Sequence, residues 1–254
     1  MKKPILETIQ STKNAIAVLI DPEKSDNGPI LENLIRQAEF SGIDFLFVGG
    51  SSVTRKEFEA TLKCIKNQTK LPIVIFPGSS VQISKEADAI LYLSLLSGRN
   101  PDFLIGHHIQ SAMELFEMSI EVMPTAYILI DGGTQSSVAY MSQTTPIPRE
   151  KLSIVKQTAL AGKFQGKQLI YLDAGSGAKH QVPVEIIADL KIVQLPLIVG
   201  GGIRTLEQIR DLHDAGASIV VIGNKLEEDS DFLLDIHHYK KNLQAAALKG
   251  NHVN

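Results

Sequence analysis

The chain has 254 residues, of which 44% are hydrophobic and 21% charged, and this suits one globular domain spanning residues 1–254. With a net charge of -3 the chain lacks the excess positive charge of nucleic-acid-binding proteins, so nucleic acid is not an expected partner. The single cysteine, Cys64, excludes an intrachain disulfide and favours a reducing, cytoplasmic location. The sequence offers neither a signal-peptide core nor the run of about 18 apolar residues that a membrane span needs.

Short apolar runs rich in Val, Ile and Leu recur along the chain. Continuous rather than alternating apolar strands indicate parallel strands buried on both faces. We expect eight strands, at residues 15–21, 44–50, 72–78, 88–94, 126–133, 168–175, 196–202 and 218–224. Amphipathic segments at 29–42, 54–68 and 205–216 predict intervening helices, and Gly42 and Gly216 fall where helix C-caps are expected.

Two connections depart from this alternation. Only "SSVQISKEA" separates the third strand from the fourth, which is short for a packing helix, whereas the next connection has room for more than one helix. Eight strand–helix repeats in about 250 residues match a (β/α)8 barrel. A doubly wound open sheet is the alternative, but it usually has fewer strands. We therefore predict a single-domain α/β protein, a (β/α)8 TIM barrel whose third helix is shortened or replaced by an irregular segment.

Glycines and polar residues follow the apolar runs directly. Gly200, Gly201 and Gly202 end the seventh run, and Gly223 and Asn224 end the eighth. In these barrels the active site lies at the C-terminal ends of the strands, and phosphate commonly binds after strands seven and eight. Glycine lets anionic oxygens approach backbone N–H groups, and the positive end of the next helix faces the anion. These loops therefore predict a phosphate cradle, with a simple tight turn as the alternative.

The stretch "YLDAGSGA" adds a second element to this site. Tyr171 and Asp173 are two residues apart on a strand and point to one side, while Leu172 points to the other. Asp173 is a candidate general base or hydroxyl-binding carboxylate, although it could instead cap the next helix. The backbone N–H groups of residues 175–177 would add further donors for a phosphate.

The stretch "LIDPEK" places a carboxylate, Asp21, at the same end of the barrel. A carboxylate facing anionic oxygens requires a cation between them, and Mg²⁺ accepts carboxylate, phosphate and water oxygens. Ser51 could add its hydroxyl to such a site. Lys24 and Arg99 are candidates for neutralising phosphate charge, with ordinary solvated surface charge as the alternative for each.

Together these motifs resemble one known family. "LIDPEK", "FLFVGGSS", "PIVIFPGSS", "YLDAGSGA", "PLIVGGGIRT" and "IVVIGN" are similar to motifs of the geranylgeranylglyceryl phosphate synthase family, which includes the bacterial PcrB-like proteins. The resemblance runs from about residue 14 to about residue 240, with the motifs in order. The pair "LIDPEK" and "YLDAGSGA" is more specific than "GGG", and "SGRNPDFLIGHH" resembles the branch with archaeal and some bacterial members.

The resemblance implies a prenyltransferase that joins sn-glycerol 1-phosphate to a long polyprenyl diphosphate, with geranylgeranyl diphosphate expected. Mg²⁺ would be required, diphosphate released and an ether lipid precursor formed. By the same resemblance Asp21 and Ser51 would hold Mg²⁺, and Asp173, where many relatives have Glu, would deprotonate the glycerol hydroxyl. The residues implied to bind glycerol phosphate are Tyr171, Leu172, Asp173, Ala174, Gly175, Ser176, Gly177, Gly201, Gly202, Gly223 and Asn224. A homo-oligomer and transient contact with a membrane surface are also implied.

The missing third helix would leave an apolar groove in the barrel wall, where a prenyl chain could lie. Two other functions remain open at this point. One is a different phosphosugar barrel enzyme, such as the isomerases of histidine or tryptophan synthesis, which would need a paired acid and base and no Mg²⁺. The other is a catalytically silent phosphate-binding barrel, against which the intact Asp21 and Asp173 argue.

Overall fold

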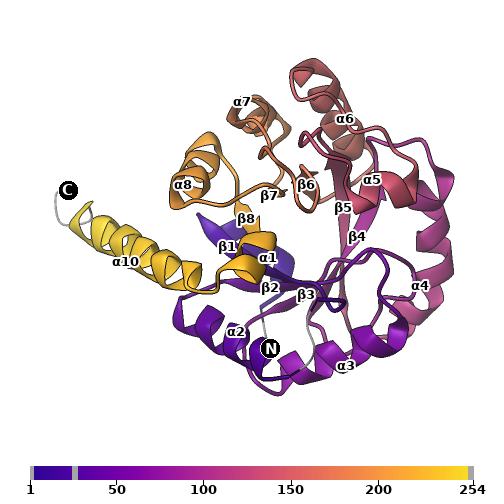
Figure 1. Ribbon diagram of the computed structural model, residues 1–254. Helices are drawn as coiled ribbons and strands as arrows, with labels where there is room; N and C mark the ends of the chain where they lie inside the picture. The colour runs from indigo at the N-terminus through magenta and orange to yellow at the C-terminus, as the bar shows by residue number, and fades with distance from the viewer. Residues whose placement is uncertain (1–2, 25–27, 251–254) are drawn as a thin grey trace.

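The chain folds into a closed barrel of parallel strands surrounded by helices (Figure 1). The computed structural model describes residues 3–24 and 28–250, with side chains as far as residue 243. Each strand pairs with the next in the chain, and β8 pairs back to β1, so the predicted (β/α)8 barrel is confirmed over the open sheet. The strands are β1 Ala15–Ile20, β2 Phe45–Val48, β3 Ile73–Ile75, β4 Ala89–Leu95, β5 Glu121–Leu129, β6 Leu169–Asp173, β7 Leu197–Gly200 and β8 Ile219–Ile222.

Helices connect most of the strands on the outside of the barrel, another precedes β1, and others follow β8. The helical elements are α1 Ile5–Ser11, α2 Pro29–Phe40, α3 Arg55–Lys66, the π-helical turn η1 Asp102–Gly106, α4 His107–Glu117, α5 Ser137–Ser142, α6 Leu152–Phe164, α7 Val184–Asp189, the 3-10 turn η2 Leu190–Val193, α8 Leu206–Ala215, α9 Asn224–Glu228 and α10 Phe232–Gly250. The helix α1, ahead of β1, packs against the apolar side chains that fill the barrel, and α9 and α10 follow β8. The helix α2 ends where Gly42 has a φ of 72°, and α8 ends at Gly216 with a φ of 120°. Glycine adopts this region without steric cost, which confirms both expected helix ends.

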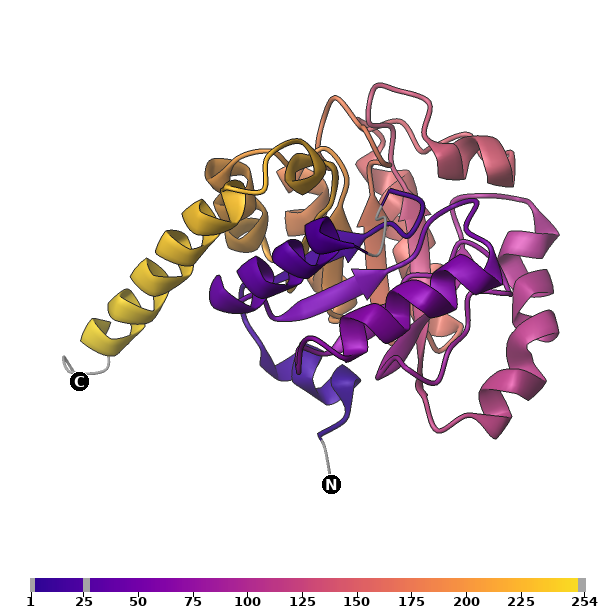
Figure 2. The same ribbon diagram turned by 60° about the horizontal axis from the view of Figure 1, so that its bottom comes forward.

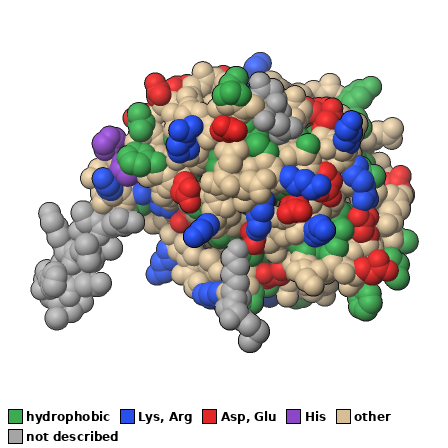
Figure 3. Space-filling model, turned by 90° about the horizontal axis from the view of Figure 1, so that it is seen from below, with side chains coloured by type: hydrophobic (Ala, Val, Ile, Leu, Met, Phe, Trp, Pro, Cys, Tyr) green, Lys and Arg blue, Asp and Glu red, His purple; other side chains and the backbone are tan. Residues whose placement is uncertain are grey.

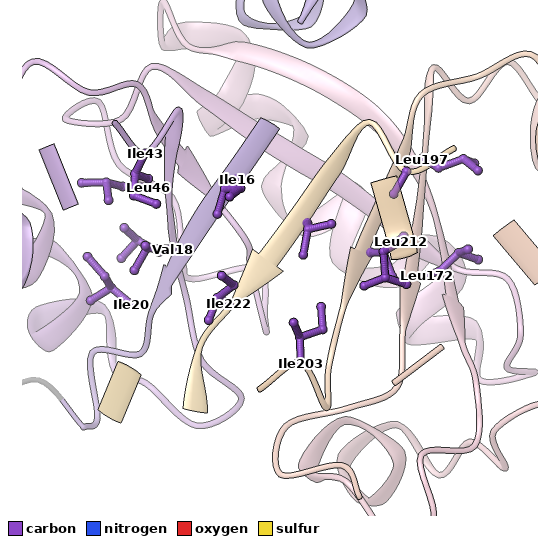
Figure 4. Packing of buried hydrophobic residues seen from close by; sticks show 14 of the residues in the cluster. Ile16, Val18, Ile20, Ile43, Leu46, Leu172, Leu197, Ile203, Leu212 and Ile222 are labelled. Carbon is purple, nitrogen blue, oxygen red and sulfur yellow. The ribbon is translucent and has the colours of Figure 1, made fainter. Parts of the chain in front are cut away.

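Alternating strand residues build two separate apolar clusters. Ile16 and Val18 of β1 belong to the outer cluster between strands and helices, part of which Figure 4 shows with Ile222 and Leu172. Ala17 of β1 belongs to the inner cluster that fills the barrel. Because successive strand side chains point to opposite faces, strands buried on both faces need an unbroken apolar sequence. The runs recognised in the sequence are therefore the strands of the barrel.

The connection between β3 and β4 contains no helix, as predicted. Residues 76–88 form turns, bends and irregular backbone. The fully buried Gln82 holds this segment against the neighbouring loop, because its Nε2 donates to Gly50 O at 2.7 Å and its Oε1 accepts from Gly78 N at 2.9 Å. The strand β3 ends at Ile75, earlier than the expected residue 78, where the chain turns into this segment.

Other elements differ from the expectations or extend them. The strand β5 begins at Glu121 rather than 126, because pairing with β4 continues through Glu121, Pro124 and Thr125, which interrupt the apolar run. The Glu121 carboxylate also accepts from Ile5 N at 2.5 Å and caps α1, a helix that the sequence did not predict. The long C-terminal α10, seen at the side of the barrel in Figure 2, is held by a 2.5 Å ion pair between Lys240 and Asp44.

Candidate active site

A cavity of about 190 Å³ opens at the C-terminal ends of the strands, and we call it the mouth cavity. It receives residues from the loops after β1, β2, β6, β7 and β8. The predicted site residues that line it are Asp21, Lys24, Ser51, Tyr171, Asp173, Ser176, Gly177, Gly201, Gly202, Gly223 and Asn224. The chain therefore brings most of the predicted set to one place.

Four predicted residues do not line the mouth cavity. Leu172 and Ala174 belong to the outer apolar cluster, because they alternate with Tyr171 and Asp173 along the strand direction. Gly175 does not line the cavity, and its N–H donates to Asp173 Oδ1. The Arg99 guanidinium donates to Gly98 O at 2.6 Å and Leu96 O at 3.3 Å within its own loop. The structure thus directs Arg99 to a loop turn rather than to the lining of this cavity.

The glycines after β7 are required by the packing of two loops. Gly201 and Gly202 have φ angles of 86° and 71°, which L side chains rarely adopt. A Cβ on Gly201 would lie 2.7 Å from Gly175 N and 2.8 Å from Ala174 N. A Cβ on Gly202 would lie 2.7 Å from His180 O. Glycine therefore lets the loop after β7 pack against the backbone after β6 while its own backbone lines the cavity.

Asn224 ties the loop after β6 to the loop after β8. Its Oδ1 accepts from Gly177 N at 2.8 Å and from Ser176 Oγ at 3.2 Å. The N–H of Gly177, which the sequence assigned to a phosphate, is thus directed at this amide oxygen. Gly223 has a negative φ of -127°, and a Cβ there would make only ordinary contact with Leu19. Neither the backbone conformation nor the packing therefore requires glycine at position 223.

Asp173 is buried at the end of β6 with both carboxylate oxygens hydrogen-bonded. Oδ1 accepts from Gly175 N at 2.7 Å, and Oδ2 accepts from the phenol of Tyr127 at 2.5 Å. Burial raises the pKa of Asp173 above its ordinary value, and the two hydrogen bonds act against that shift. A carboxylate with a raised pKa at the edge of a cavity has the character of a general base.

Asp21 lines the mouth cavity after β1 and is half-buried. Burial raises its pKa, while a 3.1 Å hydrogen bond from Glu23 N acts in the other direction. Gly50 lies against its carboxylate, where a Cβ would collide with Oδ1, and Ser51 lines the same cavity. A partly desolvated carboxylate and a hydroxyl on the lining of one cavity are donor types that fit Mg²⁺, which commonly takes one or two carboxylates and completes its shell with water and phosphate oxygens.

Ion pairs surround the mouth cavity. Lys24 Nζ lies 2.9 Å from Glu227 Oε2 and so joins the loop after β1 to α9. Arg204 pairs with Glu228 at 3.1 Å from the other side. Lys24 is where the sequence expected it, whereas Arg204, Lys225 and Glu227 were not recognised although they also line the cavity. Arg204 and Lys225 could have been found, because they follow "GGGI" and "GN" directly.

A second cavity, which we call the wall cavity, lies where the helix after β3 is missing. It has a volume of about 90 Å³ and is lined largely by apolar and aromatic side chains. Residues 76–80 and Ile83 supply one side, β4 supplies Tyr92 and Leu93, and η1 and α4 supply Phe103 and His107. The expected apolar groove is therefore present at the expected place.

The two cavities share part of their lining. Ser51, Phe76, Tyr127 and Val138 border both. The Phe76 ring stacks on Tyr171 with centroids 4.8 Å apart and meets Tyr127 edge-on at 5.8 Å. Neither Phe76 nor Tyr127 was recognised from the sequence, because an aromatic residue within an apolar run carries no sign of a site.

Among the described residues no group of three or more His, Cys, Asp or Glu side chains could hold a metal ion by itself. No helix in residues 3–24 and 28–250 has both the length and the apolar character to cross a membrane. On the face shown in Figure 3, acidic and basic side chains are interspersed.

Fold and site together define a (β/α)8 barrel whose mouth combines glycine-rich loops, a buried carboxylate and an adjoining apolar cavity. Residues 9–240 match the PcrB family, and the chain belongs to that family. It is 46% identical to the geranylgeranylglyceryl phosphate synthase of Flavobacterium johnsoniae, over 90% of this chain and 94% of the relative. The enzyme of the same name from Pyrococcus abyssi is 41% identical, over 88% of each chain.

A solved structure is also similar along nearly the whole chain. It is the (S)-3-O-geranylgeranylglyceryl phosphate synthase of Thermoplasma acidophilum in complex with its substrate sn-glycerol-1-phosphate. The TM-score is 0.87 at 33% identity, covering 93% of this chain and 96% of that one. The resemblance noted in the sequence motifs is thereby confirmed.

Proposed function

We propose that the protein is a prenyltransferase that joins sn-glycerol 1-phosphate to a polyprenyl diphosphate, with geranylgeranyl diphosphate as the expected donor. The observation that carries this proposal is the junction of the two cavities at Tyr127 and Phe76. A polar substrate in the mouth cavity and an apolar chain in the wall cavity would meet there, beside Asp173. The names of the relatives support the same activity.

Glycerol phosphate would lie across the loops after β6, β7 and β8. The backbone of Gly201 and Gly202 lines that part of the mouth cavity, and Arg204 and Lys225 bring positive charge to it. Asp173 would then receive the proton of the attacking hydroxyl. The new ether bond forms as the bond between the allylic carbon and the diphosphate breaks, and the diphosphate leaves with the electron pair.

The diphosphate end of the donor would lie near Asp21, Ser51 and Lys24. We propose that Asp21 and Ser51 hold Mg²⁺, which when bound neutralises negative charge on the leaving diphosphate. Lys24 is already close to this region and would exchange Glu227 for a phosphate oxygen. The apolar tail would follow the wall cavity between β4 and α4.

A phosphosugar isomerase is the principal alternative. It would use the mouth cavity alone and would have no need for an apolar cavity that opens into it. A silent phosphate-binding barrel would need no buried carboxylate at the cavity edge. Asp173 is the only buried Asp or Glu side chain among the described residues, which favours a catalytic use.

The decisive experiment mixes the protein with sn-glycerol 1-phosphate, geranylgeranyl diphosphate and Mg²⁺. We expect release of diphosphate and one new ether-linked product by mass spectrometry, with both lost when Mg²⁺ is chelated. Absence of diphosphate release with every prenyl donor from C10 to C35 would overturn the proposal. Turnover of a phosphosugar without a prenyl donor would favour the isomerase.

We also propose that the chain forms a homo-oligomer in the cytoplasm. Cys64 as the single cysteine supports that location. An exposed apolar stripe along η1 and α4 supports association: Ile105, Ile109, Met113 and Phe116 are 54%, 70%, 68% and 86% exposed. Light scattering on the wild type and on Phe116→Glu tests this, because a charge placed in the contact between subunits should lower the mass of the particle in solution. Binding of the monomer to lipid vesicles would instead assign the stripe to a membrane surface.

A further inference from the structure

Tyr127 occupies a position that the proposed reaction does not yet use. It lies on β5, is buried and borders both cavities. Register pairs Tyr127 with Tyr171 and Leu129 with Asp173, so the Tyr127 side chain reaches along the barrel axis to the carboxylate two residues ahead. Its Oη donates to Asp173 Oδ2 at 2.5 Å.

The surrounding aromatic rings hold the phenol in place. Tyr127 meets Tyr171 edge-on with centroids 5.6 Å apart and meets Phe76 edge-on at 5.8 Å. These ring contacts lie on the Tyr127 side chain whose Oη donates to Asp173. Such packing gives a hydrogen bond a fixed direction, which a solvent-exposed tyrosine would lack.

Because Asp173 is buried, its carboxylate depends on its hydrogen-bond donors. Burial disfavours the charged form of Asp173, and the hydrogen bonds from Tyr127 and Gly175 N–H favour it. Gly175 donates to Oδ1 through the backbone, so Tyr127 is the one side-chain donor to Asp173 among the described residues.

We propose that Tyr127 is a positioning residue for the reaction, whose phenol orients the Asp173 carboxylate and keeps it ready to accept the glycerol proton. This rests on the proposed function, in which Asp173 is the base. Tyr127 itself transfers no proton in this account. It acts through Asp173, so its removal should matter only while that carboxylate is present.

Other ionisable groups face the same space. Tyr171 lies on the same strand as Asp173 and borders the same cavity. The remaining charged residues of the mouth cavity are Asp21, Glu23, Lys24, Arg204, Lys225 and Glu227. The shift in the Asp173 pKa comes from burial, which raises it, and from the hydrogen bonds with Tyr127 and Gly175 N–H, which lower it.

The test is a double-mutant cycle with Tyr127→Phe and Asp173→Asn. A hydrogen bond to a charged group corresponds to about a 10- to 100-fold effect, so Tyr127→Phe should lower kcat by about that factor with the KM for glycerol phosphate little changed. The acidic limb of the pH profile of kcat/KM should move to higher pH, because a donor that favours the ionised carboxylate is lost. In the Asp173→Asn background Tyr127→Phe should cost little more.

Tyr239→Phe is the matched control, because Tyr239 is a buried tyrosine on α10 that lines neither cavity. It should retain wild-type kinetics. Multiplicative losses in the double variant, or an acidic limb that does not move, would overturn the positioning role. If Tyr127→Phe fails to fold, 3-fluorotyrosine at position 127 replaces it: the more acidic phenol is a stronger donor and should move the limb to lower pH.

Carbon-13 NMR of the Asp173 carboxyl separates this inference from the proposed function. The titration should move to higher pH in Tyr127→Phe whether or not the protein turns over prenyl diphosphates. An inactive wild type with this shift overturns the prenyltransferase and supports the contact between Tyr127 and Asp173. An active wild type whose Asp173 titration ignores Tyr127→Phe overturns the positioning role alone.

Discussion

Replacing Gly201 by alanine tests why the loop after β7 is built from glycine. At its φ of 86° an L residue costs about 1–2 kcal/mol. The new Cβ would lie 2.7 Å from Gly175 N and 2.8 Å from Ala174 N, so backbone must move, and such overpacking typically costs about 1–3 kcal/mol. We therefore expect Gly201→Ala to lower the free energy of unfolding by about 2–5 kcal/mol. Gly201→Val should lower the free energy of unfolding by at least as much.

Two other glycines separate the contributions. Gly166 has a φ of 82°, but nothing lies within 4 Å of its Cβ position and it lines neither cavity, so Gly166→Ala should show the backbone cost alone. Gly223 has a negative φ, and its Cβ would lie 3.6 Å from Leu19 Cβ, an ordinary contact. Gly223→Ala should therefore be close to wild type in stability, while its methyl group enters the lining of the mouth cavity.

Urea unfolding followed by circular dichroism measures the stability, and calorimetry measures the affinity for sn-glycerol 1-phosphate. We expect the loss of stability to rank Gly201→Ala above Gly166→Ala and Gly166→Ala above Gly223→Ala. Affinity should fall in Gly201→Ala and Gly223→Ala but not in Gly166→Ala. A folded Gly201→Ala or Gly201→Val protein with unchanged affinity would falsify the phosphate cradle. Equal stability of the Gly201 and Gly166 variants would refute the packing argument.

Three further predictions concern the carboxylates and the wall cavity. Asp21→Asn should weaken the Mg²⁺-dependent binding of prenyl diphosphate and leave the affinity for glycerol phosphate unchanged. Asp173→Asn should lower kcat by about 10²–10⁴-fold and leave the Mg²⁺ requirement unchanged. Titrations of Mg²⁺ and of each substrate that show the opposite pattern would reverse the two roles. Asp173→Asn should also stabilise the fold at neutral pH, because burial raises the pKa of Asp173 above 3.8 and its ionised form therefore costs stability. That gain should shrink as the pH falls through the folded-state pKa and vanish below 3.8 in thermal melts, and a gain independent of pH would contradict the assignment. Ser111→Phe places a ring in the wall cavity and should shorten the preferred prenyl chain; an unchanged product length would place the chain elsewhere.

The sequence alone was sufficient to predict the architecture and most of the residues that line the mouth cavity. A strand buried on both faces needs an unbroken apolar run, and a helix needs a periodic one, so both signals lie within a few neighbouring residues. Parallel strands in a closed barrel all end on one side. The residues that follow each run, such as Asp21, Asp173 and Gly201, therefore had to gather at the same mouth.

The partners of those residues were decided only by the tertiary structure. Arg99 and Lys24 both looked like free cations in the sequence, yet Arg99 bonds its own loop and Lys24 pairs with Glu227, 203 residues away. Tyr127 looked like one more apolar position of its strand until β5 came to lie beside β6. A hydrogen bond or an ion pair forms only between groups a few ångströms apart. Which residues come that close depends on strand register and loop packing, and the local sequence pattern of a segment determines neither.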